Sequence, residues 1–172
     1  MRNKESGLSV IILTVILAVS AIITAGAGVT TIQIMRGTER NVEHSESVQQ
    51  AHSLGRWFSR DALASSNITA GDDASTGEEE LASIYWGDWE SGGYYCIRYI
   101  WLEDVPPLKK VIRNEAEYDR EGSVIETNEN LAAYGVYTAN LTKQGDTWIF
   151  CVEARSGEKT SVQVFEIAPR LN

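Results

Sequence analysis

The stretch that decides the fold of this chain is Gly7–Met35, GLSVIILTVILAVSAIITAGAGVTTIQIM. From Ser6 to Met35 no side chain is charged, and a helix that spans a bilayer needs only about 20 mostly apolar residues. Nearly all of the acidic residues follow this stretch. The sequence therefore predicts a membrane-spanning helix joined to an acidic domain.

The charge balance argues against one class of partner. The 172 residues include 15 Lys and Arg against 24 Asp and Glu, which gives a net charge of −9. A nucleic-acid-binding protein neutralises phosphates with clustered basic residues, so we expect no nucleic-acid partner. The length leaves room for one domain besides the apolar segment.

A cleaved secretory signal is the first alternative for the apolar segment. Such a signal has an apolar core of about 7–15 residues that ends at a small-x-small site. Ala25–Ala27 and Ala27–Val29 resemble such sites, but the apolar run before them is too long for an ordinary signal. We therefore expect the segment to remain part of the protein as a helix.

The charges that flank the segment leave its orientation nearly balanced. Arg2 and Lys4 precede it, whereas Arg36 and Arg40 follow it among acidic residues. Positive residues normally mark the cytoplasmic side of a membrane helix. The large acidic remainder carries both cysteines, which suits an extracytoplasmic domain. We expect a single-pass cell-membrane protein with its N-terminus in the cytoplasm and its domain outside.

The start of the chain, MRNKESG followed by LSVIIL, resembles the class III signal of type IV pilins and type II secretion pseudopilins. This resemblance implies that a prepilin peptidase removes residues 1–7 by cleaving between Gly7 and Leu8, and then methylates Leu8. It also implies that residues 8–35 first span the membrane lipid and later enter a filament core. The implied partners are the peptidase and other pilin or pseudopilin subunits, which the N-terminal helix contacts.

Ile12 departs from the pattern of this family. Most members have Glu at the fifth mature position, where its carboxylate pairs with the N-terminal amine of a neighbouring subunit. A carboxylate in hydrocarbon is costly unless it is paired, so the usual Glu drives that docking. Because Ile12 supplies no such charge, the resemblance favours a minor or tip subunit over a major one.

Residues 36–65 are predicted to continue the helix as an amphipathic segment. They contain no proline, and a helix over residues 8–65 would be about 87 Å long. Apolar residues recur every three or four positions and predict the face that packs on the domain, namely Val48, Ala51, Leu54, Phe58 and Ala62. The residues expected to face away are Glu39, Arg40, Glu43, Glu46, Gln50 and Arg60.

Residues 66–172 are predicted to form a β-rich extracytoplasmic head. The polar residues 65–80 and the charged residues 113–122 are expected to be loops. Alternating apolar segments predict strands at Leu81–Trp86, Tyr94–Leu102, Leu108–Ile112, Leu131–Leu141, Thr147–Ala154 and Ser161–Ile167. A helix followed by antiparallel strands predicts an α+β fold, with the long helix packed on the sheet. This order also resembles the pilin layout and, loosely, the J-type heads of minor pseudopilins.

Cys96 and Cys151 both fall in predicted strands. Alternation places each of them on the face opposite the aromatic residues, so the two thiols could meet, and an extracytoplasmic domain permits a disulfide. Such a bond would stabilise the fold by roughly 4 kcal/mol in the chain-entropy model. Two separate thiols remain the alternative. Two cysteines without a nearby histidine do not make a zinc site, and we expect no metal or other cofactor.

Trp89 is the aromatic residue most suited to recognition, because it lies in the loop between two predicted strands. Strand aromatics are more often core residues. The acidic residues Asp72, Asp73, Glu78, Glu79 and Glu80 lack the alternating ligand spacing of a calcium loop, and we expect them to be solvated.

No catalytic constellation is present in the sequence. There is no nucleophile elbow, phosphate-binding loop or zinc-protease motif, so we do not expect an enzyme. The favoured hypothesis is a structural subunit, minor or at the tip, of a type IV pilus or a type II secretion pseudopilus, in the latter case serving protein transport. The alternative is an unprocessed membrane-anchored binding module, such as an adhesin or a sensor ectodomain.

Overall fold

The computed structural model describes residues 4–71, 79–87 and 92–169. It contains one helix, α1 (Lys4–Ala64), followed by the strands β1 (Asn67–Ala70), β2 (Glu80–Gly87), β3 (Tyr94–Glu103), β4 (Lys109–Tyr118), β5 (Val124–Gln144), β6 (Thr147–Ser156) and β7 (Lys159–Ile167). The chain divides into two compact units, residues 1–42 and residues 43–172. The first unit holds the N-terminal part of α1, and the second holds the rest of α1 and the sheet.

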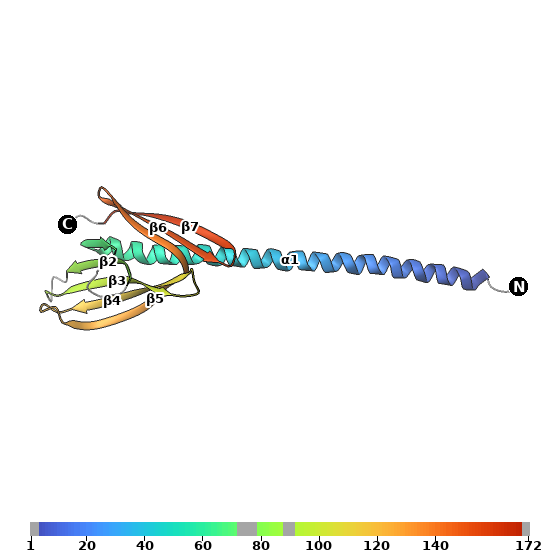
Figure 1. Cartoon of the computed structure of the whole chain (residues 1–172), viewed down its shortest axis with the longest axis horizontal. Coiled ribbons are helices and arrows are strands. Elements are labelled where there is room, and N and C mark those ends of the chain that lie inside the picture. The colour runs from blue at the N-terminus through green and yellow to red at the C-terminus, as the bar shows by residue number, and fades with distance from the viewer. Residues whose placement is uncertain (1–3, 72–78, 88–91, 170–172) are drawn as a thin grey trace. The chain divides into compact units, whose positions relative to one another are not determined.

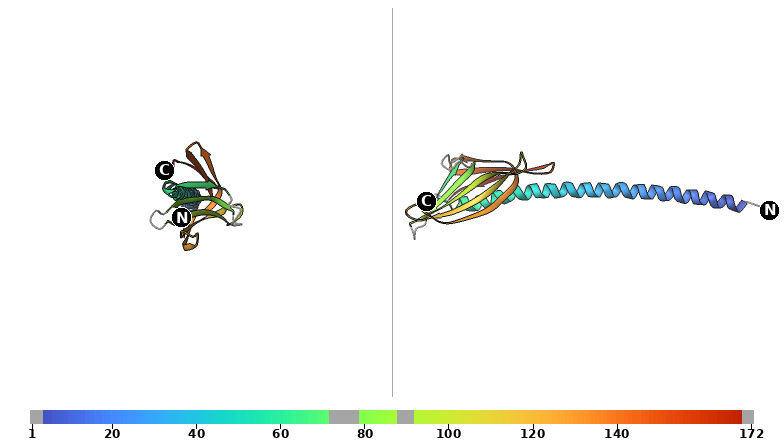
Figure 2. Two further views of the ribbon diagram at one scale, coloured as in Figure 1. Left: turned by 90° about the vertical axis from the view of Figure 1, so that its left-hand side faces the viewer. Right: turned by 60° about the horizontal axis from the view of Figure 1, so that its bottom comes forward.

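The second unit is an antiparallel meander in which every strand pairs with the next one along the chain. The order in the seven-stranded sheet is β1-β2-β3-β4-β5-β6-β7 (Figure 1), which leaves β1 and β7 as the two edges. The strands curve round the part of α1 that belongs to this unit (Figure 2). The prediction of an α+β fold, with a long N-terminal helix packed on an antiparallel sheet, is confirmed.

Gly135 makes the bend that allows one sheet to curve round a helix. Residues of β5 before it pair with β4, and those after it pair with β6, with Val136 paired to both neighbours. Gly135 has a φ of 62°, and a Cβ at this position would lie 2.8 Å from the carbonyl oxygen of Arg155. Only glycine takes this backbone conformation without strain in so little space.

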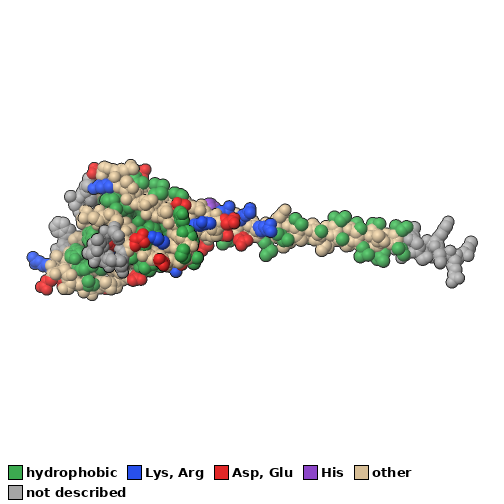
Figure 3. Space-filling model, viewed as in Figure 1, with side chains coloured by type: hydrophobic (Ala, Val, Ile, Leu, Met, Phe, Trp, Pro, Cys, Tyr) green, Lys and Arg blue, Asp and Glu red, His purple; other side chains and the backbone are tan. Residues whose placement is uncertain are grey.

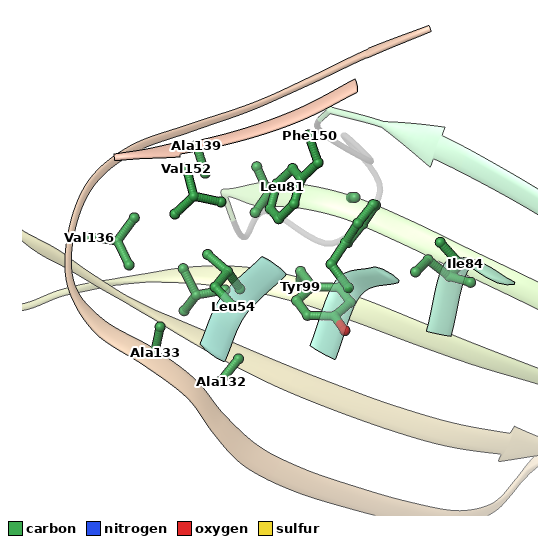
Figure 4. Packing of buried hydrophobic residues seen from close by; sticks show 14 of the residues in the cluster. Leu54, Leu81, Ile84, Tyr99, Ala132, Ala133, Val136, Ala139, Phe150 and Val152 are labelled. Atoms are coloured by element: carbon green, nitrogen blue, oxygen red, sulfur yellow. The ribbon is translucent and has the colours of Figure 1, made fainter. Parts of the chain in front are cut away.

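The core lies between α1 and the concave face of the sheet. Leu54 of α1 points toward side chains from both halves of the sheet (Figure 4). Leu54 and Phe58 belong to one buried cluster with Leu81, Tyr99, Val136, Phe150 and Val152. The Phe58 ring meets Tyr99 edge-on at 5.3 Å and lies 4.4 Å from Phe150, measured between ring centroids. Burial of these large apolar groups is the main force that holds α1 on the sheet.

The buried face of α1 follows the predicted stripe with one change. Ala51, Leu54, Phe58 and Ala62 are fully buried, but Ser47 takes the place expected for Val48, which is only half-buried. The Ser47 hydroxyl donates to the carbonyl of His44, so its burial leaves no unpaired polar group there.

Two expected loops contain strands. Residues 67–70 form the short edge strand β1, and β4 extends from Lys109 to Tyr118 through most of the expected charged loop at 113–122. Ile68 is buried in β1, and Arg113 and Ala116 are buried in β4. The charged residues in this range predicted a loop. Arg113 can nevertheless be buried in a strand, because its side chain has an ionic partner inside the protein.

Candidate functional site

The apolar part of α1 makes no packing contact that would explain its composition. α1 is long and apolar enough to cross a membrane, and none of its most apolar stretch is buried within the protein. From Val10 to Met35 no side chain is charged, and hydrophobic side chains are visible along the described part of the first unit (Figure 3). A helix that is apolar on all sides and buries nothing is typical of a membrane span.

The threonines in this stretch carry no unpaired hydroxyl. Thr14, Thr24, Thr30 and Thr31 each donate a hydrogen bond of 2.8–2.9 Å to the backbone carbonyl four residues earlier. A lone hydroxyl in hydrocarbon is costly, whereas one bonded to its own helix is tolerated. The threonine hydroxyls of the segment are thus compatible with a lipid environment.

The predicted processing positions lie at the start of this helix. Gly7 and Leu8 both belong to α1, and Ile12 follows one turn later with 52% of its surface exposed. An exposed isoleucine places no charge on the helix surface here. The cleavage and methylation at these positions stay predictions.

The expected disulfide is not formed in the structure. Cys96 is buried on β3 and Cys151 is half-buried on β6, and both are recorded as thiols. The two strands are not neighbours, because β4 and β5 lie between them in the sheet. Alternation correctly placed Cys151 opposite the buried Phe150 and Val152, but it could not show how far apart in the sheet the two strands would lie.

Other predicted positions divide between described and undescribed parts of the chain. Trp89 and the acidic residues Asp72, Asp73 and Glu78 lie outside the described residues. Glu79 pairs with Lys109 at 2.7 Å. Glu80 was expected to be solvated and is instead buried at the start of β2, where it accepts a hydrogen bond from Ser83. Among the described residues, no group of three or more potential metal ligands lies together.

A buried ionic cluster, Asp61–Arg113–Tyr99, joins the C-terminal end of α1 to the sheet. The Arg113 Nε donates to Asp61 Oδ2 at 2.6 Å, and the Tyr99 hydroxyl donates to the same oxygen at 2.7 Å. The side chains of Asp61 and Arg113 are each only 5% exposed. Their hydrogen bonds fix one rotational and axial position of α1 on strands β3 and β4.

The electrostatics of this cluster keep Arg113 charged. Burial disfavours its guanidinium, but the hydrogen bonds to Asp61 and Glu115 outweigh that effect, so the pKa of Arg113 lies above its usual value. Burial and the negative charge of Asp61 raise the pKa of Tyr99, which therefore stays protonated and donates. The cluster is therefore a fixed structural connection between the helix and the sheet.

A second polar contact holds α1 on the sheet near the start of its buried face. Glu46 accepts hydrogen bonds of 2.7 Å from the hydroxyls of Tyr134 and Ser156, and Gln50 accepts one from the backbone N–H of Tyr134. Both helix residues were expected to face away from the sheet, so that prediction is wrong for them. The bonds from Ser156 and Tyr134 lower the pKa of Glu46.

A basic groove runs along the face of α1 that the sheet leaves uncovered. It has a volume of about 820 Å³ and is lined by residues between Ser45 and Arg60, including His52, Arg56, Trp57 and Arg60. The Arg60 guanidinium lies 4.2 Å from the centre of the Trp57 ring, and that of Arg113 lies 5.2 Å from it.

The ionic cluster and the basic groove were both missed from the sequence, although one signal was present. Asp61 falls between Phe58 and Ala62 at the spacing of the buried stripe, and a carboxylate there requires a buried partner. The identity of that partner depends on which strand lies against the end of the helix, which no local pattern reveals.

Comparisons with protein-family models, curated proteins and solved structures found no match.

Proposed function

We propose that this protein is a membrane-anchored structural subunit of a pilin-type filament, in a minor position, and that it is not an enzyme. A prepilin peptidase would cleave between Gly7 and Leu8. The exposed apolar part of α1 would hold the subunit in the membrane and then pack with the helices of other subunits, while the head stays outside.

The observation that carries the proposal is the exposed, charge-free stretch of α1 that follows the Gly7–Leu8 junction. An anchor alone needs an apolar helix, but it does not need a short basic leader ending in glycine at the edge of that helix. The α+β head on the same continuous helix agrees with the layout that the resemblance implies. The exposed Ile12 supports a minor position, since it offers no carboxylate to a neighbour's amine.

The decisive experiment is mass spectrometry of the mature N-terminus, from the native host or from cells that express a prepilin peptidase. The expected chain begins at N-methylated Leu8. Gly7→Val should block that cleavage and leave the leader attached. The matched control is Gly26→Ala, at a site where an added Cβ has no neighbour within 4 Å, and it should be processed normally.

Two outcomes would overturn the proposal in different ways. An intact Met1 in the wild-type chain would favour the unprocessed binding module. A chain that starts near Gly28 or Val29 would mean that signal peptidase removes the apolar segment, and that the head is released.

A further inference from the structure

The basic groove of α1 carries more positive charge than its neighbours neutralise, because Arg60 shares the single carboxylate of Asp61 with Arg113. None of the described residues that line the groove is a carboxylate, although the chain as a whole has a net charge of −9. Arg56 is exposed and forms no ion pair with any described residue, and the Arg60 side chain is 62% exposed. The groove therefore presents two guanidiniums to an acidic partner.

Trp57 gives this groove a fixed floor. Guanidiniums from α1 and β4 lie over its ring, because Arg60 and Arg113 stand 4.2 and 5.2 Å from the ring centre. Arg113 is in turn fixed by the buried carboxylate of Asp61. The position of Arg60 is thus set before any partner arrives, which lowers the entropy lost on binding. With its ring covered in this way, Trp57 suits an anionic partner better than a stacked sugar.

An acidic pair on the sheet, Glu117–Glu126, also carries charge that its described neighbours do not neutralise. Glu117 of β4 and Glu126 of β5 are directly opposite each other in the antiparallel ladder, so their side chains share one face. Like charges in this arrangement destabilise a sheet. Neither carboxylate forms an ion pair with a described residue, in contrast to Glu115, which binds Arg113 at 2.7 Å. The acidic pair therefore lacks the cation that would relieve its repulsion.

We propose that the acidic pair Glu117–Glu126 of one copy docks in the basic groove of a second copy, with Arg56 and Arg60 as its counter-charges. The inference rests on the proposed function, because it names the neighbour of the subunit in the assembly. Both surfaces belong to the same compact unit and make no ion pair with each other among the described residues, so a second copy would supply the counter-charges. Because the contact joins two different surfaces, it is compatible with an open row of copies and with a two-fold dimer in which the two contacts form reciprocally.

This contact also accounts for Ile12. A subunit that has no carboxylate at this point of its membrane helix needs another way to select its neighbour, and opposite charges on the heads supply one. The arrangement requires at least two adjacent copies. It therefore favours a minor subunit within the filament over a single copy at the tip.

The test is self-association of the full-length protein in an excess of nonionic detergent, followed by sedimentation velocity. Association should weaken as salt rises from about 50 to 500 mM, because exposed charges are screened. Arg56→Glu and Glu126→Arg should each weaken it roughly tenfold or more, since each places like charges in contact. A mixture of the two variants should associate again, because Glu at position 56 then faces Arg at position 126.

The matched controls reverse one charge each outside the contact. Arg40→Glu lies on the same helix before the groove, and Glu129→Arg lies on the same strand with its side chain on the opposite face. Both should associate like the wild type. Unchanged thermal unfolding, followed by circular dichroism, would show that every variant is folded.

Three results would overturn this inference: a monomeric wild type, association that neither reversal weakens, or two weakened variants that do not recover when mixed. The N-terminus of the same preparation is measured in parallel. A chain that begins at methylated Leu8 but does not self-associate would refute the contact between copies and leave the proposed function standing. An uncleaved chain that self-associates as described would refute the proposed function and leave the contact between copies standing.

Discussion

At the scale of single residues, Asp61 is the group that ties α1 to the sheet. Its two carboxylate oxygens accept hydrogen bonds from Tyr99 and Arg113, and Arg60 reaches it from the solvent side at 3.3 Å. A buried charge of this kind is well tolerated only while its partners are present. Asp61 therefore matters more to the position of the helix than the exposed charges around it.

Asp61→Asn should destabilise the protein by about 3–5 kcal/mol, because it leaves the buried guanidinium of Arg113 without a full counter-charge. The matched control is Arg60→Gln, which removes the exposed partner of the same carboxylate and should cost only about 0–1 kcal/mol. Urea unfolding of the full-length protein in detergent measures both. Equal costs for the two variants would show that the buried pair has no special role.

Glycine has a packing role at one position on α1. A Cβ on Gly55 would overlap the Phe165 ring of β7, so the absence of a side chain lets this edge strand lie directly on the helix. His52, one turn earlier, meets the same ring edge-on. This role of Gly55 could not be predicted from the sequence, because a close contact with β7 cannot be inferred from neighbouring residues.

At the scale of elements, the contact that Glu46 of α1 makes with β5 and β6 depends on pH. Glu46 accepts hydrogen bonds from Ser156 and Tyr134, which lower its pKa below the ordinary value of 4.5. A carboxylate whose pKa is lowered by folding adds stability above its unfolded pKa and loses that stability as the pH falls through the folded value. The contact is therefore strongest at neutral pH and weakens under acid conditions.

Glu46→Gln should lower the melting temperature at pH 7, and this effect should shrink as the pH falls and Glu46 itself becomes protonated. Thermal unfolding over a series of pH values from 7 downward measures this difference. Glu39→Gln is the control, since Glu39 is exposed on the same helix and accepts no described hydrogen bond. A difference between wild type and Glu46→Gln that stays constant with pH would contradict the assignment.

The elements also show how far sequence patterns reach. The helix, its buried stripe and six of the strands could be predicted because apolar periodicity reports which residues face a core. The pattern failed where polar residues are buried by partners distant in sequence, as for Arg113 in β4 and Glu80 in β2. Likewise, a helix residue expected to face solvent can contact the sheet, as Glu46 does when it accepts a hydrogen bond from the Tyr134 hydroxyl.

At the scale of the whole molecule, the two units differ in what stabilises them. The second unit, residues 43–172, contains the entire buried core, the ionic cluster and the Glu46 contact. None of the apolar side chains that the structure describes in the first unit is buried within the protein. The change in charge and hydropathy after Met35 predicts a division of this kind, but it does not reveal that the residues from Glu43 onward belong to the unit that contains the sheet.

A chain that begins at Glu43 should therefore fold by itself into a soluble head. We expect a cooperative thermal transition and a near-ultraviolet circular dichroism spectrum like that of the full-length protein. A chain that begins at Ser59 is the matched control and should not fold, because it lacks the buried Ala51, Leu54 and Phe58. Binding of a hydrophobic dye by the longer fragment would instead mean that residues before Glu43 complete the core.

The simple strand order has a consequence for how the head is made. Because each strand pairs with the next one in sequence, every hairpin can close as soon as its second strand has been delivered, with the helix already present to receive it. Contacts between nearby residues form quickly, and little chain has to wait unpaired. The head can thus be assembled in the order of synthesis, and Gly135 is the point where the growing sheet turns to cover the other side of the helix.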